Sequence, residues 1–194
     1  MLPDLILIKA IVTLFIILDP LGNVPIFISL TQSASPSRKK KIFHLATIVA
    51  FILLLIFGLA GQQILILFGI SLHEFMIAGG ILLLLLSMKT LFWGERHKVI
   101  TEEVGAVPIA TPLLVGPGTI TATIVLLETT GLFVTMSSIL INFLIIVVMF
   151  RFIENIHKFL GKVGAMVMNR IMAIFLAAIA VGFIIEGIRI VYSL

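Results

Sequence analysis

The chain has 194 residues, of which 61% are hydrophobic and 11% are charged, and its formal net charge is +4. A mean hydropathy of +1.31 excludes a soluble globular domain and predicts an all-α integral membrane protein. Because the chain contains no cysteine, disulfides and thiolate metal sites are also excluded. In such a protein the distribution of basic residues indicates membrane topology, and the net positive charge does not indicate affinity for nucleic acid. We therefore expect the lipid bilayer as a partner and no nucleic acid.

Six apolar stretches are long enough to be predicted as membrane spans, because a straight span needs about 20 residues. They cover roughly residues 4–33, 42–68, 73–92, 104–130, 132–152 and 169–191. The first apolar run has no basic flank before it and is followed by Asp19-Pro20, so we expect a span here and not a cleaved leader. The stretch from Ile153 to Val163 alternates apolar and basic residues, which predicts an amphipathic helix at the membrane interface.

Two motifs interrupt the first and fourth of these stretches. Residues 19–25 read Asp-Pro-Leu-Gly-Asn-Val-Pro, and residues 111–119 read Thr-Pro-Leu-Leu-Val-Gly-Pro-Gly-Thr. A single shift of 92 positions (112 minus 20, and 117 minus 25) superimposes Pro20 and Pro25 on Pro112 and Pro117. Each proline frees backbone groups that lipid cannot satisfy. The motifs therefore predict discontinuous helices 1 and 4, which are typical of transporter binding sites.

The distribution of lysine and arginine predicts the orientation of the chain. Eleven of the 13 basic residues fall in or near the loops after spans one, three and five. Such loops face the cytoplasm. We therefore expect a multi-pass protein of the cell (inner, cytoplasmic) membrane, with both termini outside.

Three spans followed by three spans predict two inverted repeats within a single transmembrane domain covering residues 1–194. Repeat one covers residues 1–93, a cytoplasmic linker covers residues 94–103, and repeat two covers residues 104–194.

The chemistry of the two breaks suits a small zwitterion. Helix N-termini expose unpaired N–H groups for a carboxylate, and the ends of the incoming half-helices expose carbonyls for an ammonium group or Na⁺. Glycines allow a ligand to approach the main chain. Candidate substrate-binding residues are Gly22, Asn23, Thr111, Gly116, Gly118 and Thr119. The residues predicted to break the helices are Pro20, Pro25, Pro112 and Pro117.

Asp19 is the sharpest single candidate, because a carboxylate at membrane depth needs a partner or a proton. It could bind a substrate ammonium, coordinate Na⁺, or carry a coupling proton. Asp19 is the single candidate metal ligand. It could instead serve only as a helix cap. No other cofactor is expected. In the fifth span, we expect Asn142 to bond to a neighbouring helix.

The two motifs, read in order over nearly the whole chain, resemble those of the MarC family of prokaryotic inner-membrane proteins. The resemblance implies transport of small neutral amino acids such as glycine and alanine, coupled to a cation gradient. It assigns the motif positions to Asp19, Pro20, Gly22, Asn23 and Pro25 in the first half, and to Pro112, Gly116, Pro117, Gly118 and Thr119 in the second half.

The sequence therefore favours a secondary transporter of the glycine and alanine class that is driven by Na⁺ or H⁺ and works by alternating access. Two alternatives stay open: a channel or facilitator for a small polar solute, and a membrane subunit that transports nothing. An enzyme is not expected, because the chain has no Gly-x-Ser-x-Gly or His-Glu-x-x-His motif. The number of protomers is undetermined, and a homo-oligomer is one of the options.

Overall fold

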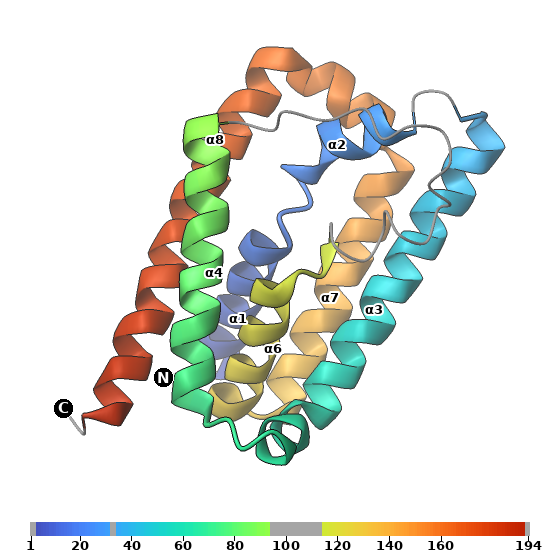
Figure 1. The fold of residues 1–194 in the computed structure, drawn as a ribbon. Coiled ribbons are helices and arrows are strands. Elements are labelled where there is room, and N and C mark those ends of the chain that lie inside the picture. The colour runs from blue at the N-terminus through green and yellow to red at the C-terminus, as the bar shows by residue number, and fades with distance from the viewer. Residues whose placement is uncertain (1–2, 32–33, 94–113, 193–194) are drawn as a thin grey trace.

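The computed structural model of the protein describes residues 3–31, 34–93 and 114–192, and all regular elements in these ranges are α-helices. They are α1 (Pro3–Leu18), α2 (Asn23–Leu30), α3 (Pro36–Leu67), α4 (Leu72–Trp93), α6 (Pro117–Thr130), α7 (Leu132–Arg151) and α8 (Ile153–Val191). Figure 1 shows a bundle whose long helices run between the same two ends. The predicted linker 94–103 and the first part of the fourth span, residues 104–113, lie outside the described residues.

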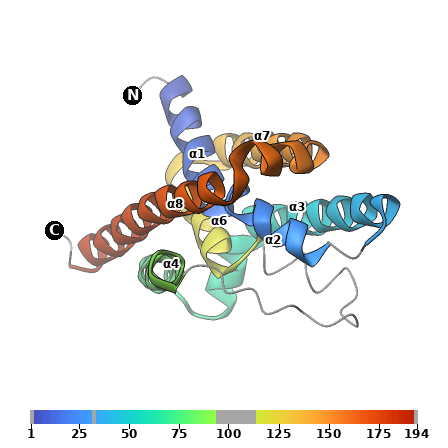
Figure 2. The same cartoon turned by 90° about the horizontal axis from the view of Figure 1, so that it is seen from above.

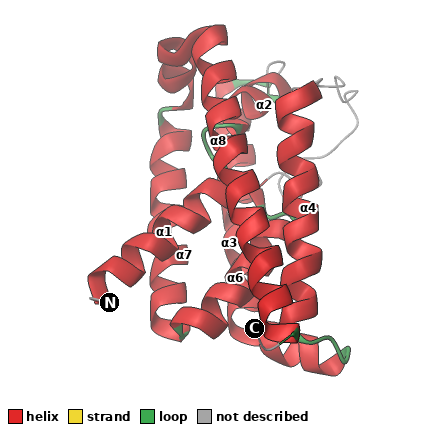
Figure 3. Ribbon diagram, turned by 90° about the vertical axis from the view of Figure 1, so that its left-hand side faces the viewer, coloured by secondary structure: helices red, strands yellow, loops and turns green. Residues whose placement is uncertain are grey.

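The first predicted span is broken, as the sequence indicated. Helix α1 ends at Leu18, and α2 begins at Asn23 after a short turn. In Figure 1, α1 ends and α6 begins at about the middle height of the bundle, whereas α2 continues toward the upper end. Figure 3 shows that α1 crosses the bundle obliquely. The break therefore lies in the interior of the bundle and not at its surface.

The turn between α3 and α4 follows from its sequence. Gly69 has a φ of 65°, a left-handed conformation that ends α3 at little steric cost. Helix α4 then begins with a capping box, in which the Ser71 N–H donates to Glu74 Oε2 at 2.9 Å and the Glu74 N–H donates to Ser71 Oγ at 3.4 Å. Together these residues turn the chain and return it through the bundle as α4.

Helix α8 contains the predicted amphipathic segment and the last span in one element. Its backbone leaves the helical conformation at Gly161, where φ is 61° and ψ is −177°. Figure 1 shows the part before this kink lying across the upper end of the bundle. The last span was expected to begin at residue 169, but the apolar helix extends from Val163 to Val191. The earlier start is a correction: the helical conformation resumes directly after Gly161, so the apolar helix includes the residues before 169.

Four of the described helices are long and apolar enough to cross a membrane: Pro36–Leu67, Leu72–Phe92, Leu132–Arg151 and Val163–Val191. Helix α1 has 16 residues and α6 has 14, so neither reaches the length of a full span by itself. For α1 the reason is the break at residues 19–22. The described part of the chain thus contains several apolar helices of membrane-spanning length.

Helix α6 occupies the centre of the bundle and packs against α1, α3, α4 and α7 (Figure 2). From Leu114 to Leu126 nearly every side chain that can be described is buried or partly buried, including Thr121 and Thr123. A helix that is enclosed on all sides in this way is a core element. It is therefore well placed to form part of an internal site.

The most extensive helix pair, α4 with α8, packs closely through glycines. A Cβ on Gly80 would lie 2.7 Å from the Ala180 carbonyl oxygen, and a Cβ on Gly187 would lie 2.8 Å from the His73 carbonyl oxygen. Small residues of this kind let helix backbones approach each other within a membrane.

Replacing Gly80 by alanine is expected to push α4 and α8 apart, because the obstacle is backbone and cannot rotate away. Overpacking of this kind costs about 1–3 kcal/mol. The apparent melting temperature in detergent should therefore fall by several degrees. The matched control is Gly182→Ala on α8, where a Cβ would meet no atom within 4 Å. Equal melting temperatures for the two variants would contradict this account of the packing.

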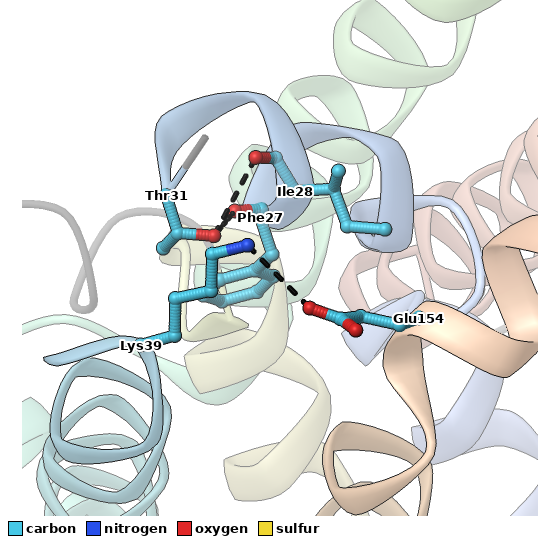
Figure 4. A network of polar contacts seen from close by, with 5 residues as sticks. All are labelled: Phe27, Ile28, Thr31, Lys39 and Glu154. Atoms are coloured by element: carbon cyan, nitrogen blue, oxygen red, sulfur yellow. Dashed lines mark hydrogen bonds and ion pairs between the residues drawn. The ribbon is translucent and has the colours of Figure 1, made fainter. Parts of the chain in front are cut away.

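At the upper end of the bundle, the start of α3 is joined to the start of α8. Lys39 Nζ lies 3.5 Å from Glu154 Oε1, and beside them the Thr31 hydroxyl donates to the Phe27 carbonyl at 2.7 Å (Figure 4). Beneath these groups, the rings of Phe27, Phe43 and Phe150 pack together, with centroids 4.6 to 5.6 Å apart. An apolar cluster thus closes the end of the bundle that carries the basic residues 38–41.

Candidate functional site

The break between α1 and α2 provides partners for its own backbone groups. The Gly22 N–H donates to Asp19 Oδ1 at 3.0 Å, and Asn23 Nδ2 donates to the Leu18 carbonyl at 3.1 Å. Leu18, Gly22 and Asn23 are buried. Since an unpaired buried backbone group costs several kcal/mol in lipid, these two side chains make the interruption of the helix tolerable. The capping role of Asp19 is therefore real.

Asp19 also holds an unusual backbone conformation. Its φ is 42°, and it is the one non-glycine residue with a positive φ in the part of the chain that the structure describes. Aspartate tolerates this region better than most residues. Unfavourable backbone conformations are often found at functional sites, where the surrounding structure maintains them. The second carboxylate oxygen, Oδ2, lies beside Gly22 and is not the acceptor of the capping bond.

The two break motifs differ in where their prolines fall. Pro20 is buried in the turn before α2, whereas Pro25 is the third residue of α2 and Pro117 is the first residue of α6. The first turn of a helix accepts proline because its N–H groups have no partner within the helix. Asp19-Pro20 therefore precedes the outgoing half-helix. Its predicted counterpart, Thr111-Pro112, lies outside the described residues.

The start of α6 repeats one feature of the first break. The Thr119 hydroxyl donates to the Leu114 carbonyl at 3.4 Å, five residues back, just as the Asn23 amide donates to Leu18. These equivalent bonds relate the two breaks by 96 positions (119 minus 23, and 114 minus 18). This register differs from the shift of 92 given by the prolines, because the prolines occupy different places in their helices. It also pairs Gly22 with Gly118.

The glycines at the breaks have different surroundings. A Cβ on Gly118 would overlap the side chain of Leu83 in α4, so this glycine permits close packing of α4 on α6. A Cβ on Gly116 would meet no atom within 4 Å. A Cβ on Gly22 would overlap both Asp19 Oδ2 and Asn169 Oδ1. Of these three glycines, Gly22 is thus the one whose missing side chain leaves room for polar oxygens.

Three threonines in the first half of α6, at positions 119, 121 and 123, are buried. Thr119 and Thr123 are 3% and 0% exposed, and the Thr123 hydroxyl donates to the Thr119 carbonyl at 2.8 Å. Thr121 lies against Gly79 of α4. Because this part of α6 is surrounded by α1, α3, α4 and α7, threonines on different faces of the helix are all buried.

Asn142 has the structural role that was predicted for it. Its Nδ2 donates to the Ile11 carbonyl of α1 at 3.1 Å and to the Ser138 carbonyl at 2.8 Å. The prediction of a bond to a neighbouring helix is confirmed.

Asn169 of α8 was missed by the sequence reasoning. Its Oδ1 is buried without a hydrogen-bond partner among the described residues, and it lies against Gly22 beside the Asp19 carboxylate. The signal that could have identified it is an uncharged amide standing at the start of the last predicted span. Its partner is 150 positions away in the sequence (169 minus 19), so the contact could not be foreseen.

The structure therefore brings Asp19, Gly22, Asn23 and Asn169 together at one place. Leu18 and Val24, which flank the break, share a buried apolar cluster with Leu114 and Val115 at the start of α6. Among the described residues, no basic side chain lies within ion-pairing distance of Asp19. Nor do three or more His, Cys, Asp or Glu side chains gather there to hold a metal. A cation at this place would depend on one carboxylate with amide and backbone oxygens.

These features define the class of the protein: an integral membrane protein of several apolar helices with a polar helix break inside the bundle. Residues 5–192 match a family described as MarC family integral membrane protein, and the chain belongs to the MarC family. The resemblance stated from the motifs is thus confirmed.

Several relatives support the assignment. A UPF0056 membrane protein of Archaeoglobus fulgidus is 42% identical, with 91% of this chain and 89% of the relative covered. One of Methanocaldococcus jannaschii is 38% identical, with 91% and 93% covered. The UPF0056 membrane protein YhcE of Escherichia coli is 33% identical, with 93% and 91% covered. No solved structure matches the chain.

Proposed function

We propose that the protein is a secondary transporter of small neutral amino acids, of the glycine and alanine class, coupled to Na⁺ or H⁺. The observation that carries the proposal is the break at residues 19–22, where a carboxylate without an ion pair among the described residues stands inside an apolar bundle. Discontinuous helices of this kind form substrate and ion sites in secondary transporters. A polar residue at membrane depth is costly and is a functional hypothesis by default.

The substrate would bind between the breaks of the first and fourth spans. Its carboxylate would be held at the N-terminal ends of α2 and α6, where the helix dipole favours negative charge, and its ammonium by Asp19. Glycine and alanine suit this place because Gly22 leaves little room beyond the polar atoms around it. Gly116, Gly118 and Thr119 stay predicted contacts, as does Thr111.

The proposal includes two inverted repeats, and several of the helix contacts support it. An inverted repeat would exchange the first span (α1 and α2) with the fourth (which includes α6), α3 with α7, and α4 with α8. Under this exchange the pair α1·α7 becomes the pair α3·α6. The pair α4·α6 becomes the packing of α1 and α2 on α8, and all these pairs are in contact. The pairs α3·α7, α4·α8 and α1·α6 map onto themselves. Rocking of two such halves about the central break would expose the site to each side in turn.

The proposal is tested by uptake of labelled glycine and alanine into proteoliposomes, with a Na⁺ gradient in one set and an H⁺ gradient in another. Accumulation above the outside concentration under one gradient supports a coupled transporter and names its ion. Equilibration of the labelled amino acid that does not depend on either gradient supports a channel or facilitator instead. Absence of flux for any amino acid tested would favour a subunit that transports nothing. No enzymatic activity is proposed.

The proposed orientation places both termini outside the cell and the basic end of the bundle in the cytoplasm. Since the chain has no cysteine, Ser37→Cys and Tyr192→Cys each introduce one thiol, and both positions are exposed. We expect a membrane-impermeant maleimide to label Tyr192→Cys in intact cells, and Ser37→Cys only after permeabilisation. The reverse pattern would invert the orientation.

A further inference from the structure

We infer that Asn169 of α8 completes a cation seat with Asp19, in which a positively charged group bridges the helix break and the last span. The inference rests on the proposed function and names a residue of that same site. The two oxygens that form the seat are Asp19 Oδ2 and Asn169 Oδ1, which converge on the space left by the missing side chain of Gly22.

The two oxygens are both acceptors, and both lie against the position that a Cβ on Gly22 would take. Asp19 uses Oδ1 to cap the Gly22 N–H, so Oδ2 is the oxygen directed at the amide. Asn169 Oδ1 is enclosed and accepts no hydrogen bond from the residues that the structure describes. A buried acceptor without a donor destabilises the fold. A cation between the oxygens would remove this cost and also attract the carboxylate.

Within the part of the chain that the structure describes, no ion pair compensates the charge of the Asp19 carboxylate. The ion pairs within the described residues join Lys39 to Glu154 and Arg189 to Glu186, and neither includes Asp19. A carboxylate in an apolar bundle without a countercharge favours binding of a cation over the empty state.

Binding at this place would have a mechanical consequence. Asp19 belongs to the turn between α1 and α2, whereas Asn169 follows the hinge glycine Gly161 on α8 by eight positions (169 minus 161). A cation held by both would tie the break to the last span and stabilise the packing seen here. A ligand that binds one arrangement better than another shifts the population toward it. The seat would thus link occupancy to the position of α8.

The ligand chemistry is that of a small cation, with two sources: Na⁺ or the ammonium group of an amino acid. The test measures the melting temperature of the purified full-length protein in NaCl and in methylammonium chloride, each against choline chloride at equal ionic strength. Choline carries the same charge, but it has no N–H and is larger than methylammonium. Stabilisation by NaCl alone assigns the seat to Na⁺, and stabilisation by methylammonium assigns it to an ammonium group. No stabilisation by either salt overturns the inference.

Variants of Asn169 identify the residue. We expect Asn169→Ala to lose the salt-dependent shift, and Asn169→Asp to keep it, because aspartate retains the oxygen and lacks an N–H. Asn155→Ala, at an exposed asparagine of the same helix, should behave as the wild type. A shift that survives in Asn169→Ala, or that is lost in Asn169→Asp, would overturn the inference. Melting temperatures in choline chloride monitor whether each variant folds.

This assay requires no transport, so its outcome is separable from that of the proposed function. If the shift is present but no amino acid is carried, the seat stands and the transporter proposal fails. If amino acids are carried and Asn169→Ala keeps the wild-type shift, the proposed function stands and the role of Asn169 is wrong.

Discussion

Replacing Asp19 by asparagine is expected to reduce concentrative uptake of glycine by about a hundredfold or more. The asparagine side-chain oxygen can still accept the Gly22 N–H, so the cap at the break is retained. What is lost is the negative charge facing the site. Removing one partner of a buried charge pair costs about 3–5 kcal/mol, which corresponds to a loss of this size. The measurement is the initial rate in proteoliposomes under the gradient that drives the wild type.

The matched control for this variant is Asp4→Asn, at an exposed carboxylate in the first turn of α1. It should retain wild-type uptake. The melting temperature of Asp19→Asn should lie close to that of the wild type, because the hydrogen bonds of the break are preserved. Unchanged uptake with Asp19→Asn would remove the carboxylate from the mechanism and leave it as a cap alone.

Replacing Gly22 by alanine is expected to have the second largest effect. The added Cβ would overlap Asp19 Oδ2 and Asn169 Oδ1, so the two oxygens could no longer approach each other. The φ of Gly22 does not lie in the left-handed region, so the backbone itself accepts alanine and the effect is steric. We expect loss of at least about 1–3 kcal/mol of stability from overpacking, and uptake reduced at least tenfold.

The control for this glycine is Gly182→Ala, where the same methyl group meets open space. It should leave both uptake and melting temperature unchanged. The comparison distinguishes a steric effect that is specific to Gly22 from a general intolerance of alanine in place of glycine in these helices. Wild-type uptake by Gly22→Ala would show that the polar atoms around this glycine do not contact the substrate or its coupling ion.

The sequence by itself determined the class of the protein and the position of its principal break. Hydropathy predicts spans because every backbone group in lipid must be satisfied internally. Pro20 and Gly22 interrupt such a span, and the structure accordingly ends α1 at Leu18. The capping role of Asp19 was also accessible, since it depends on a residue three positions away. These are local properties, which a sequence records directly.

Three further features were decided by tertiary structure. The last span begins at Val163 because the hinge at Gly161 redirects α8, a conformation that hydropathy does not specify. The equivalence of Asn23 and Thr119 appears only in their hydrogen bonds and not in the spacing of the prolines. The approach of Asn169 to Asp19 requires α8 to fold back onto the break. Contacts between distant residues depend on how helices pack, and the packing is set by side chains of many helices together.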